Sequence, residues 1–445
     1  MRTTAFIVHF VLVISATSLS QPATTPRQGE PRGGFPSSLV YYEAATLPSQ
    51  TPGFSRVDVL YRIDMSFFVA VRDPSKPLFS EFVRKGEVQI ELMDSNGTVS
   101  RKIQRFEVPA KGTEAKPGTT WHSGQVSMDL IPGNYVISFT IEDSESERSV
   151  SDRTRRVNVR DFAQNSPSIS SPLLVKPVDK SDTALLYPVN FGGGIRFGHA
   201  AMVAVQTTGI SEEIASVELR VEKSERGKDS TVVRSGHEQA IVRNGASLVP
   251  VMDGDVPAYK IMDTEAGSTV SILPLDAEKL YPGIYTLTIT AGAESLTQQF
   301  AVVWPDMPRS LQNPAFAFDA LRFITTSDEL DSLESGSEEE RMDRFDEFWA
   351  TKDRTPGTAM NEVMTEYYSR VDHALMTFGT LRDPDGTRTD RGRIHILYGF
   401  PTKVERNLDP SGFIEVWSYE GARKKFIFLD ETKTGNYVLT STRPL

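Results

Sequence analysis

The sequence predicts a mainly β protein with a C-terminal α+β domain: tandem immunoglobulin-like β-sandwiches followed by a domain of helices and an antiparallel sheet. Short runs of alternating apolar and polar residues, separated by turn residues, recur between residues 57 and 303, as sandwich strands do. A Pro-Gly-x-Tyr turn occurs twice in that region, and beyond residue 306 the apolar spacing becomes helical. We therefore expect sandwiches at residues 37–162 and 163–305 and an α+β domain at residues 306–445.

The first 36 residues have the pattern of an export signal followed by a flexible linker. Arg2 precedes an apolar stretch at residues 5–16, and Ser18 and Ser20 place small residues at the −3 and −1 positions of a cleavage site. The stretch is shorter than the about 20 residues that a membrane-spanning helix needs. We expect a signal peptide at residues 1–20 and a linker at residues 21–36, with an uncleaved anchor or a chance apolar start as the alternatives.

Composition limits the classes of partner and of chemistry that the chain can have, whereas the expected export rests on the N-terminal pattern. The formal net charge is −11, and loss of residues 1–20 removes only Arg2, which leaves −12. This balance argues against nucleic acid and against an anionic membrane surface, since both bind clustered Lys and Arg. The chain has no cysteine, which excludes disulfides, a thiol nucleophile and Cys-ligated metal. We expect an exported protein, periplasmic or extracellular, without a transmembrane anchor after signal cleavage, whose partner is an envelope protein or a glycan.

The first predicted sandwich begins with alternation at residues 57–61. Asn96-Gly97 is a hairpin signal because both residues tolerate positive φ, and residues 103–108 supply the returning strand. Further strands are expected at residues 67–71, 136–141 and 157–159.

The second predicted sandwich repeats this scheme. A second Asn-Gly pair, Asn244-Gly245, predicts another hairpin. The turn Pro132-Gly133-Asn134-Tyr135 of the first half returns as Pro282-Gly283-Ile284-Tyr285, and each is followed by a strand. Pro and Gly set the turn, and we expect each Tyr ring to lie over the sandwich edge. Strands are expected at residues 201–205, 217–221, 286–290 and 300–303.

Helical spacing defines the start of the C-terminal domain. Ser327 is a candidate helix cap, and Ser337 with Glu340 fits a capping box. A further helix is expected from Thr358 to Phe378. A meander of antiparallel strands should follow at residues 393–398, 415–419, 426–429 and 437–440.

The predicted helices at residues 328–347 are strongly acidic. This segment has ten acidic and two basic residues. It is interpreted first as a solvated acidic helix pair. The alternative is a docking face for a basic partner.

A run of residues in the C-terminal domain is similar to a known family. The run includes residues 348–378, then Gly386-Thr387-Arg388-Thr389-Asp390 followed by Arg391-Gly392-Arg393-Ile394. Over residues 311–442 the chain resembles the GWxTD domain family, with Thr387 in place of the signature Trp. The resemblance implies the C-terminal part of an exported protein from a bacterium with two membranes, and it implies no activity.

Charged residues around this signature form the candidate cluster. Thr389 and Asp390 can close a turn through bonds from side chain to backbone. Arg391 just before the expected strand and Arg393 at its start should pair with acids of the preceding helix such as Glu362, Glu366 or Asp372. The alternative is an anion or glycan site. The candidate binding or structural residues are Glu366, Arg370, Thr389, Asp390, Arg391 and Arg393.

Two function classes follow from these observations. His373 and His395 are expected as a solvent-facing pair on a helix and a strand, and the motifs predict no catalytic, cofactor-binding or metal-binding residues. The first class is a non-enzymatic envelope protein that binds or spaces partners. The second is a hydrolase or glycan-processing accessory with its site near Asp390. A cleft with two carboxylates about 5 to 9.5 Å apart would favour the second, and arginines paired inside the fold would favour the first.

Overall fold

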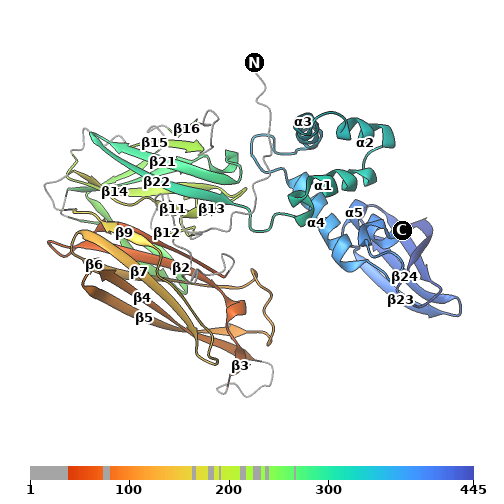
Figure 1. The fold of residues 1–445 in the computed structure, drawn as a ribbon, viewed down its shortest axis with the longest axis horizontal. Coiled ribbons are helices and arrows are strands. Elements are labelled where there is room, and N and C mark those ends of the chain that lie inside the picture. The colour runs from red at the N-terminus through yellow and green to blue at the C-terminus, as the bar shows by residue number, and fades with distance from the viewer. Residues whose placement is uncertain are drawn as a thin grey trace, which may run out of the picture. The chain divides into compact units, whose positions relative to one another are not determined.

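The computed structural model describes residues 39–73, 81–162, 167–178, 185–189, 192–210, 217–223, 232–235, 240–264 and 267–445. The expected signal peptide and linker lie outside these residues. The described chain forms two compact units, which divide in sequence between Val303 and Trp304 (Figure 1). The first is built of β-sheets and the second of helices with one sheet, so the predicted fold class is confirmed. No helix among the described residues has both the length and the apolar character needed to cross a bilayer.

The first β-module packs two antiparallel sheets around one core. One sheet has the order β1-β2-β6, and the other has the order β3-β4-β7-β8, with β5 beside β4 and β9 beside β7. Val59, Tyr61, Ile90 and Phe139 come from both sheets and are buried in the same cluster. The strands are β1 (Val40–Pro48), β2 (Ser55–Asp64), β3 (Ala70–Arg72), β4 (Phe82–Asp94), β5 (Gly97–Ala110), β6 (Trp121–Leu130), β7 (Gly133–Asp143), β8 (Ser149–Asp152) and β9 (Arg156–Val159).

The second β-module has three sheets. Their orders are β10-β14-β20-β17 with β11 beside β14, then β12-β19-β18, and β13-β22-β21-β15-β16. All pairs are antiparallel except β13 with β22. The strands are β10 (Ser168–Ile169), β11 (Leu173–Val175), β12 (Leu185–Leu186), β13 (Gly194–Arg196), β14 (Ala201–Thr208), β15 (Val217–Lys223), β16 (Val232–Ser235), β17 (Ile241–Asn244), β18 (Ala246–Asp253), β19 (Val256–Asp263), β20 (Ser268–Leu275), β21 (Gly283–Ala291) and β22 (Glu294–Val303).

The two Asn-Gly pairs have different roles. Asn96-Gly97 closes the β4–β5 hairpin, as predicted. The hairpin expected at Asn244-Gly245 is wrong, because β17 pairs with β20 whereas β18 pairs with β19 in another sheet. Gly245, at φ 62°, turns the chain from one sheet to the next. The Asn-Gly signal identified a sharp turn, but it could not say which strands the turn joins.

The repeated Pro-Gly-x-Tyr turn has the same hydrogen bond in both modules. The Tyr135 hydroxyl donates to the Ile131 carbonyl at 2.8 Å, and the Tyr285 hydroxyl donates to the Tyr281 carbonyl at 2.9 Å. Both rings are buried at the start of a strand, β7 or β21. Each phenol therefore fixes the turn that precedes its own strand, as in the tyrosine corner of immunoglobulin-like sandwiches.

The two β-modules share a buried interface. Strand β2 is buried on both faces: Val59 points into the first module, whereas Leu60 packs with Leu47 against the second. The second cluster continues through Leu248 and Tyr259 of β18 and β19. Because the β1–β2 sheet contributes to both hydrophobic cores, the two β-modules form one compact unit and are not independent domains.

A buried polar network crosses this interface. The Arg56 Nε lies 3.0 Å from Asp58 Oδ1, and the Asp58 side chain is fully buried. A second Arg56 nitrogen donates to the Leu248 carbonyl at 2.8 Å, and the Tyr259 hydroxyl donates to Asp58 Oδ2 at 3.0 Å. Each of these two bonds from β2 to the second module thus involves a charge-bearing side chain, and hydrogen bonds to charged groups are stronger than neutral ones.

The helices of the C-terminal unit begin at polar caps. Thr326 caps α2 with Glu329, one residue before the predicted Ser327, and Ser337 with Glu340 caps α3 as predicted. The expected helix from Thr358 begins later, at the Asn361 cap of α4. The helices of this unit are α1 (Pro314–Ala320), α2 (Ser327–Glu334), α3 (Glu338–Ala350), α4 (Glu362–Thr377) and α5 (Asp390–Tyr398), with short 3₁₀ turns at Arg309–Gln312, Leu321–Phe323 and Gly386–Arg388. The β-modules contain 3₁₀ turns at Met65–Phe67 and Ala277–Lys279.

The sheet of this unit is an antiparallel meander in the order β23-β24-β25-β26. The expected strand at residues 393–398 is wrong, because these residues lie in α5. Ile394 and Ile396 do alternate, but His395 between them is buried as well, so the alternation does not mark a two-faced strand. Tyr368 of α4, Ile394 of α5 and Trp417 of β24 share one core. The strands are β23 (Lys403–Asp409), β24 (Gly412–Tyr419), β25 (Lys424–Asp430) and β26 (Val438–Pro444).

Candidate functional site

Arg391 lies in the interior of the C-terminal unit. Its guanidinium is 3.6 Å from Glu415 of β24, and the two side chains are only 16% and 4% exposed. It also donates to the Gly435 carbonyl at 3.2 Å and lies 4.2 Å from the centre of the Tyr437 ring. Burial lowers the pKa of Arg391, and the Glu415 carboxylate opposes this shift. The expected pairing with acids of α4 is wrong for this residue.

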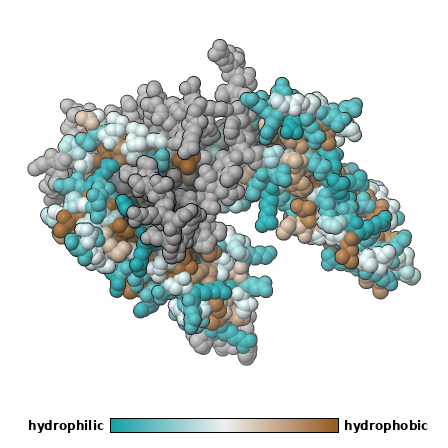
Figure 2. All heavy atoms as spheres, in the orientation of Figure 1, coloured by the Kyte–Doolittle hydropathy of each residue, from teal (hydrophilic) through white to brown (hydrophobic). Residues whose placement is uncertain are grey.

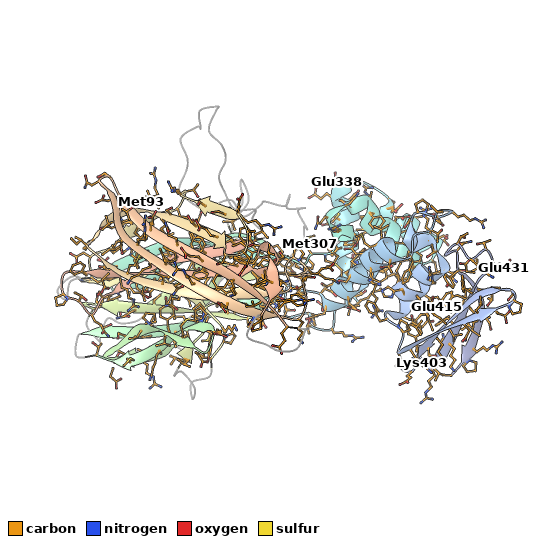
Figure 3. The ribbon with its side chains drawn as sticks, turned by 90° about the horizontal axis from the view of Figure 1, so that it is seen from below. Met93, Met307, Glu338, Lys403, Glu415 and Glu431 are labelled. Carbon is orange, nitrogen blue, oxygen red and sulfur yellow. The ribbon has the colours of Figure 1, made fainter. Side chains whose placement is uncertain are left out.

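Glu415 is the centre of the internal network, and the sequence reasoning missed it. Trp417 Nε1 donates to Glu415 Oε1 at 2.6 Å, and Arg406 Nε lies 3.5 Å from Glu415 Oε2. Figure 3 shows Glu415 in the sheet of this unit. The signal was present, because Glu415 occupies the same strand face as buried Trp417 and Tyr419. An acid on an apolar strand face indicates a buried partner.

Thr389 and Asp390 begin helix α5. The Thr389 hydroxyl accepts from the Gly392 amide at 3.1 Å and donates to the Gly386 carbonyl at 2.8 Å. Asp390 Oδ2 accepts from the Leu439 amide at 2.7 Å, which ties the helix start to β26. Arg393 lies 4.0 Å from Asp390 and is half exposed. Arg393 therefore pairs within its own helix, and the expected pairing with α4 is wrong here too.

Glu366 and Arg370 form a separate pair on α4. Their side chains are 2.8 Å apart and four residues apart on the helix. The Arg370 guanidinium packs closely against Gly399. Of the other expected acids, Glu362 accepts from the Thr355 hydroxyl at 2.5 Å, and Asp372 accepts from the Ser310 amide at 2.9 Å. The six candidates thus occupy two places, and Glu366 is not joined to Asp390.

The signature glycines allow backbone elements to touch. A Cβ on Gly386 would clash with the Ala374 carbonyl oxygen of α4, and a Cβ on Gly392 would clash with the Gly386 carbonyl oxygen. Both obstacles are backbone atoms, which cannot rotate away as a side chain can. The two glycines therefore hold α4, the Gly386 turn and α5 together at close range.

Thr387, in place of the signature Trp, is buried in a small polar network. Its hydroxyl donates to Asp385 Oδ1 at 2.6 Å and accepts from Arg322 at 3.0 Å. The residue is 1% exposed. A hydroxyl with two partners thus occupies this position, and no indole is needed to complete the local packing.

The two histidines meet, but they do not form a solvent-facing pair. Their ring centres are 4.5 Å apart, and His395 is buried on α5. Phe400 lies against both rings, 4.8 Å from His373 and 4.7 Å from His395. Burial, followed by the nearby His373 and Arg370, lowers the pKa of His395 to about 4. The expectation of exposure failed because the chain reverses between α4 and α5 and packs the two helices together, which the sequence pattern did not show.

Helices α2 and α3 form an acidic surface with a shallow apolar hollow. Leu333 and Phe348 supply its apolar lining, and Asp328, Glu329 and Ser332 complete it, around a volume of about 360 Å³. Figure 2 shows a mostly hydrophilic surface over these two helices. Glu338, at the start of α3, is labelled on this helical part in Figure 3. The acids gather on one pair of helices, whereas the cluster around Asp390 is largely internal.

These features define a modular β protein that carries a helix-and-sheet domain whose charged signature residues hold its parts together. Residues 283–443 match the family model of the GWxTD domain. The chain therefore carries a GWxTD domain in its C-terminal region, and the suspected family is confirmed there.

Comparison with whole proteins adds little. No curated protein matches this chain. A solved titin fragment (Titin-A168169) is 9% identical, and the alignment covers 59% of this chain and 97% of that one with a TM-score of 0.12. A score this low carries no argument about the fold.

Proposed function

We propose that this chain is an exported bacterial envelope protein that binds and spaces partners without catalysing a reaction. The β-modules would act as a stiff spacer, and the C-terminal unit would dock a partner. The observation that carries the proposal is the internal pairing of Arg391 with Glu415 at 3.6 Å, where the Glu415 side chain is buried and the Arg391 side chain is only 16% exposed. A charge already paired inside the fold is poorly placed to meet a substrate.

The geometry around Asp390 also supports a structural role. Its carboxylate accepts the Leu439 amide of β26, which ties the start of α5 to the sheet. Thr389 caps the same helix through its hydroxyl. Asp390 and Thr389 thus have the bonds expected of a helix start joined to a sheet edge.

The shared interface of the β-modules supports the spacing role. Leu47 and Leu60 of the first module are buried in one cluster with Leu248 and Tyr259 of the second. A linker of flexible residues would let such modules move freely, whereas a common core restricts their relative motion. A stiff pair of modules fits the spacing role in this proposal.

A pull-down from an envelope extract tests the proposal. Two baits are compared: residues 21–445, and a shorter chain that ends at Val303. The shorter chain ends there because the two units divide after Val303 and each unit has its own buried core. Loss of a defined partner with the shorter bait is the expected result. Recovery of the same partner by both baits would contradict docking by the C-terminal unit, and turnover of an envelope glycan that Asp390→Ala abolishes would contradict the non-catalytic role.

A further inference from the structure

The hollow between α2 and α3 has an apolar lining and an acidic rim. Leu333 and Phe348 are only partly buried, and they pack against the core of the unit while facing the hollow. Asp328 and Glu329 stand in the first turn of α2 at its edge. The surrounding segment at residues 328–347 has ten acids and two bases. Such a surface is complementary to a segment that presents an apolar side chain among cations.

One of the chain's own cations lies on the aromatic ring that lines this hollow. The Lys352 ammonium lies 3.7 Å from the centre of the Phe348 ring. Its positive charge also acts on Glu329, where it helps the Thr326 amide and hydroxyl lower the pKa of that carboxyl. The Lys352 ammonium thus lies against the face of the Phe348 ring and also stabilises the charged form of Glu329. Lys352 is exposed just beyond the end of α3, so another cation can displace it.

We infer that this hollow binds a cationic segment of another polypeptide, in which Arg or Lys residues flank one apolar anchor. This inference rests on the proposed docking function and names its site and the chemistry of its partner. The anchor packs against Leu333, and a flanking guanidinium or ammonium takes the place of Lys352 on the Phe348 ring. The acids of the rim accept the remaining cations and raise the rate of encounter.

Binding of a defined peptide tests the site in the full chain. The probe is a short fluorescent helical peptide with arginines around a single leucine, and its partner peptides carry serine for the leucine or glutamates for the arginines. Fluorescence anisotropy gives Kd at low and at physiological salt. We expect the arginine–leucine peptide to bind best, and salt to weaken it.

Four variants distinguish binding in the hollow from non-specific attraction of the peptide to the acidic surface. Asp328→Lys replaces an acid that lines the hollow by a cation and should weaken binding about tenfold, because the new ammonium repels the arginines of the peptide. Phe348→Leu keeps an apolar side chain but removes the ring, and should weaken binding about threefold. Lys352→Ala removes the internal competitor and should tighten binding. The matched control is Glu339→Lys, an exposed acid of α3 that does not line the hollow, which should change Kd by less than about 1.5-fold.

The outcomes distinguish this inference from the proposed function. No binding to the unaltered chain at about 1 mM peptide overturns the inference. An equal loss with Glu339→Lys and Asp328→Lys also overturns it, because charge alone would then explain binding. If Asp328→Lys with Phe348→Leu retains an envelope partner that the chain ending at Val303 loses, docking stands and the partner binds elsewhere on the C-terminal unit.

Discussion

Removal of one partner from the buried network between the β-modules should destabilise them strongly. Asp58 is fully buried and holds both Arg56 and Tyr259. Asp58→Ala leaves the Arg56 guanidinium without its counter-ion and the Tyr259 hydroxyl without its acceptor. Breaking a buried ion pair from one side costs about 3 to 5 kcal/mol. We expect a loss in this range, with both modules affected because the bonds cross their interface.

A double variant provides the internal comparison. In Arg56→Met with Asp58→Leu, both charges are absent, so no ion remains buried without a partner. Replacement of a buried pair by apolar residues is often neutral or stabilising. The double variant should therefore be at least about 2 kcal/mol more stable than Asp58→Ala. Asp276→Ala, which breaks the exposed pair with Lys279, is the surface control and should cost less than about 1 kcal/mol.

Urea denaturation with hydrogen exchange read by mass spectrometry measures these effects strand by strand. Peptides from β2 and β19 report on the first and second modules separately. In Asp58→Ala, both peptides should lose protection together. A loss below about 1 kcal/mol, or a loss confined to β2, would refute a shared, ion-dependent interface.

Three further predictions concern the packing and the titrating groups. Gly392→Ala should destabilise the C-terminal unit by roughly 3 kcal/mol because its Cβ meets the Gly386 backbone, whereas Gly357→Ala, with open space around it, should be neutral in the same thermal melts. The pKa of His395 is about 4 in the folded chain, below its ordinary value of 6.5. The folded state therefore keeps its full stability above pH 6.5 and loses about 3 kcal/mol of it as the pH falls from 6.5 towards 4. His395→Leu should flatten that pH dependence, and an unchanged slope would contradict it. Burial raises the pKa of Glu43 to about 7 from 4.5, so stability is lost as the pH rises through this range. Glu43→Gln should therefore stabilise the β unit by about 1 to 2 kcal/mol at about pH 8 and have little effect near pH 4.5 in chemical denaturation, and equal effects at both values would contradict the assignment.

The features that the sequence predicted correctly depend on neighbours in the chain. Asn96-Gly97 closes its hairpin within two residues, and Ser337 meets Glu340 three residues later. Tyr135 and Tyr285 bond to carbonyls four residues earlier, so the repeat was visible as a motif. In each case, the residues that form the contact are together in the sequence, and their chemistry can be read directly.

The features that it predicted wrongly depend on residues far apart in the chain. Arg391 was expected to meet acids of the preceding helix, but it pairs with Glu415, which follows an intervening strand. The alternation of Ile394 and Ile396 resembles a strand, yet the segment is a helix that is buried on most sides. The spacing of apolar residues distinguishes a helix from a strand only when one face of the element is polar. It cannot do so for an element that is buried on most sides.

The sequence by itself determined the local turns, the helix caps, the mainly β class and the suspected domain family, because each rests on short spacings or a continuous motif. Only the tertiary structure decided that β2 is buried on both faces, that Arg391 and Glu415 form an internal pair, and that the Lys352 ammonium lies over the Phe348 ring. These facts require the chain to bring distant residues together, and the strength of a charge contact depends on the burial that such packing creates.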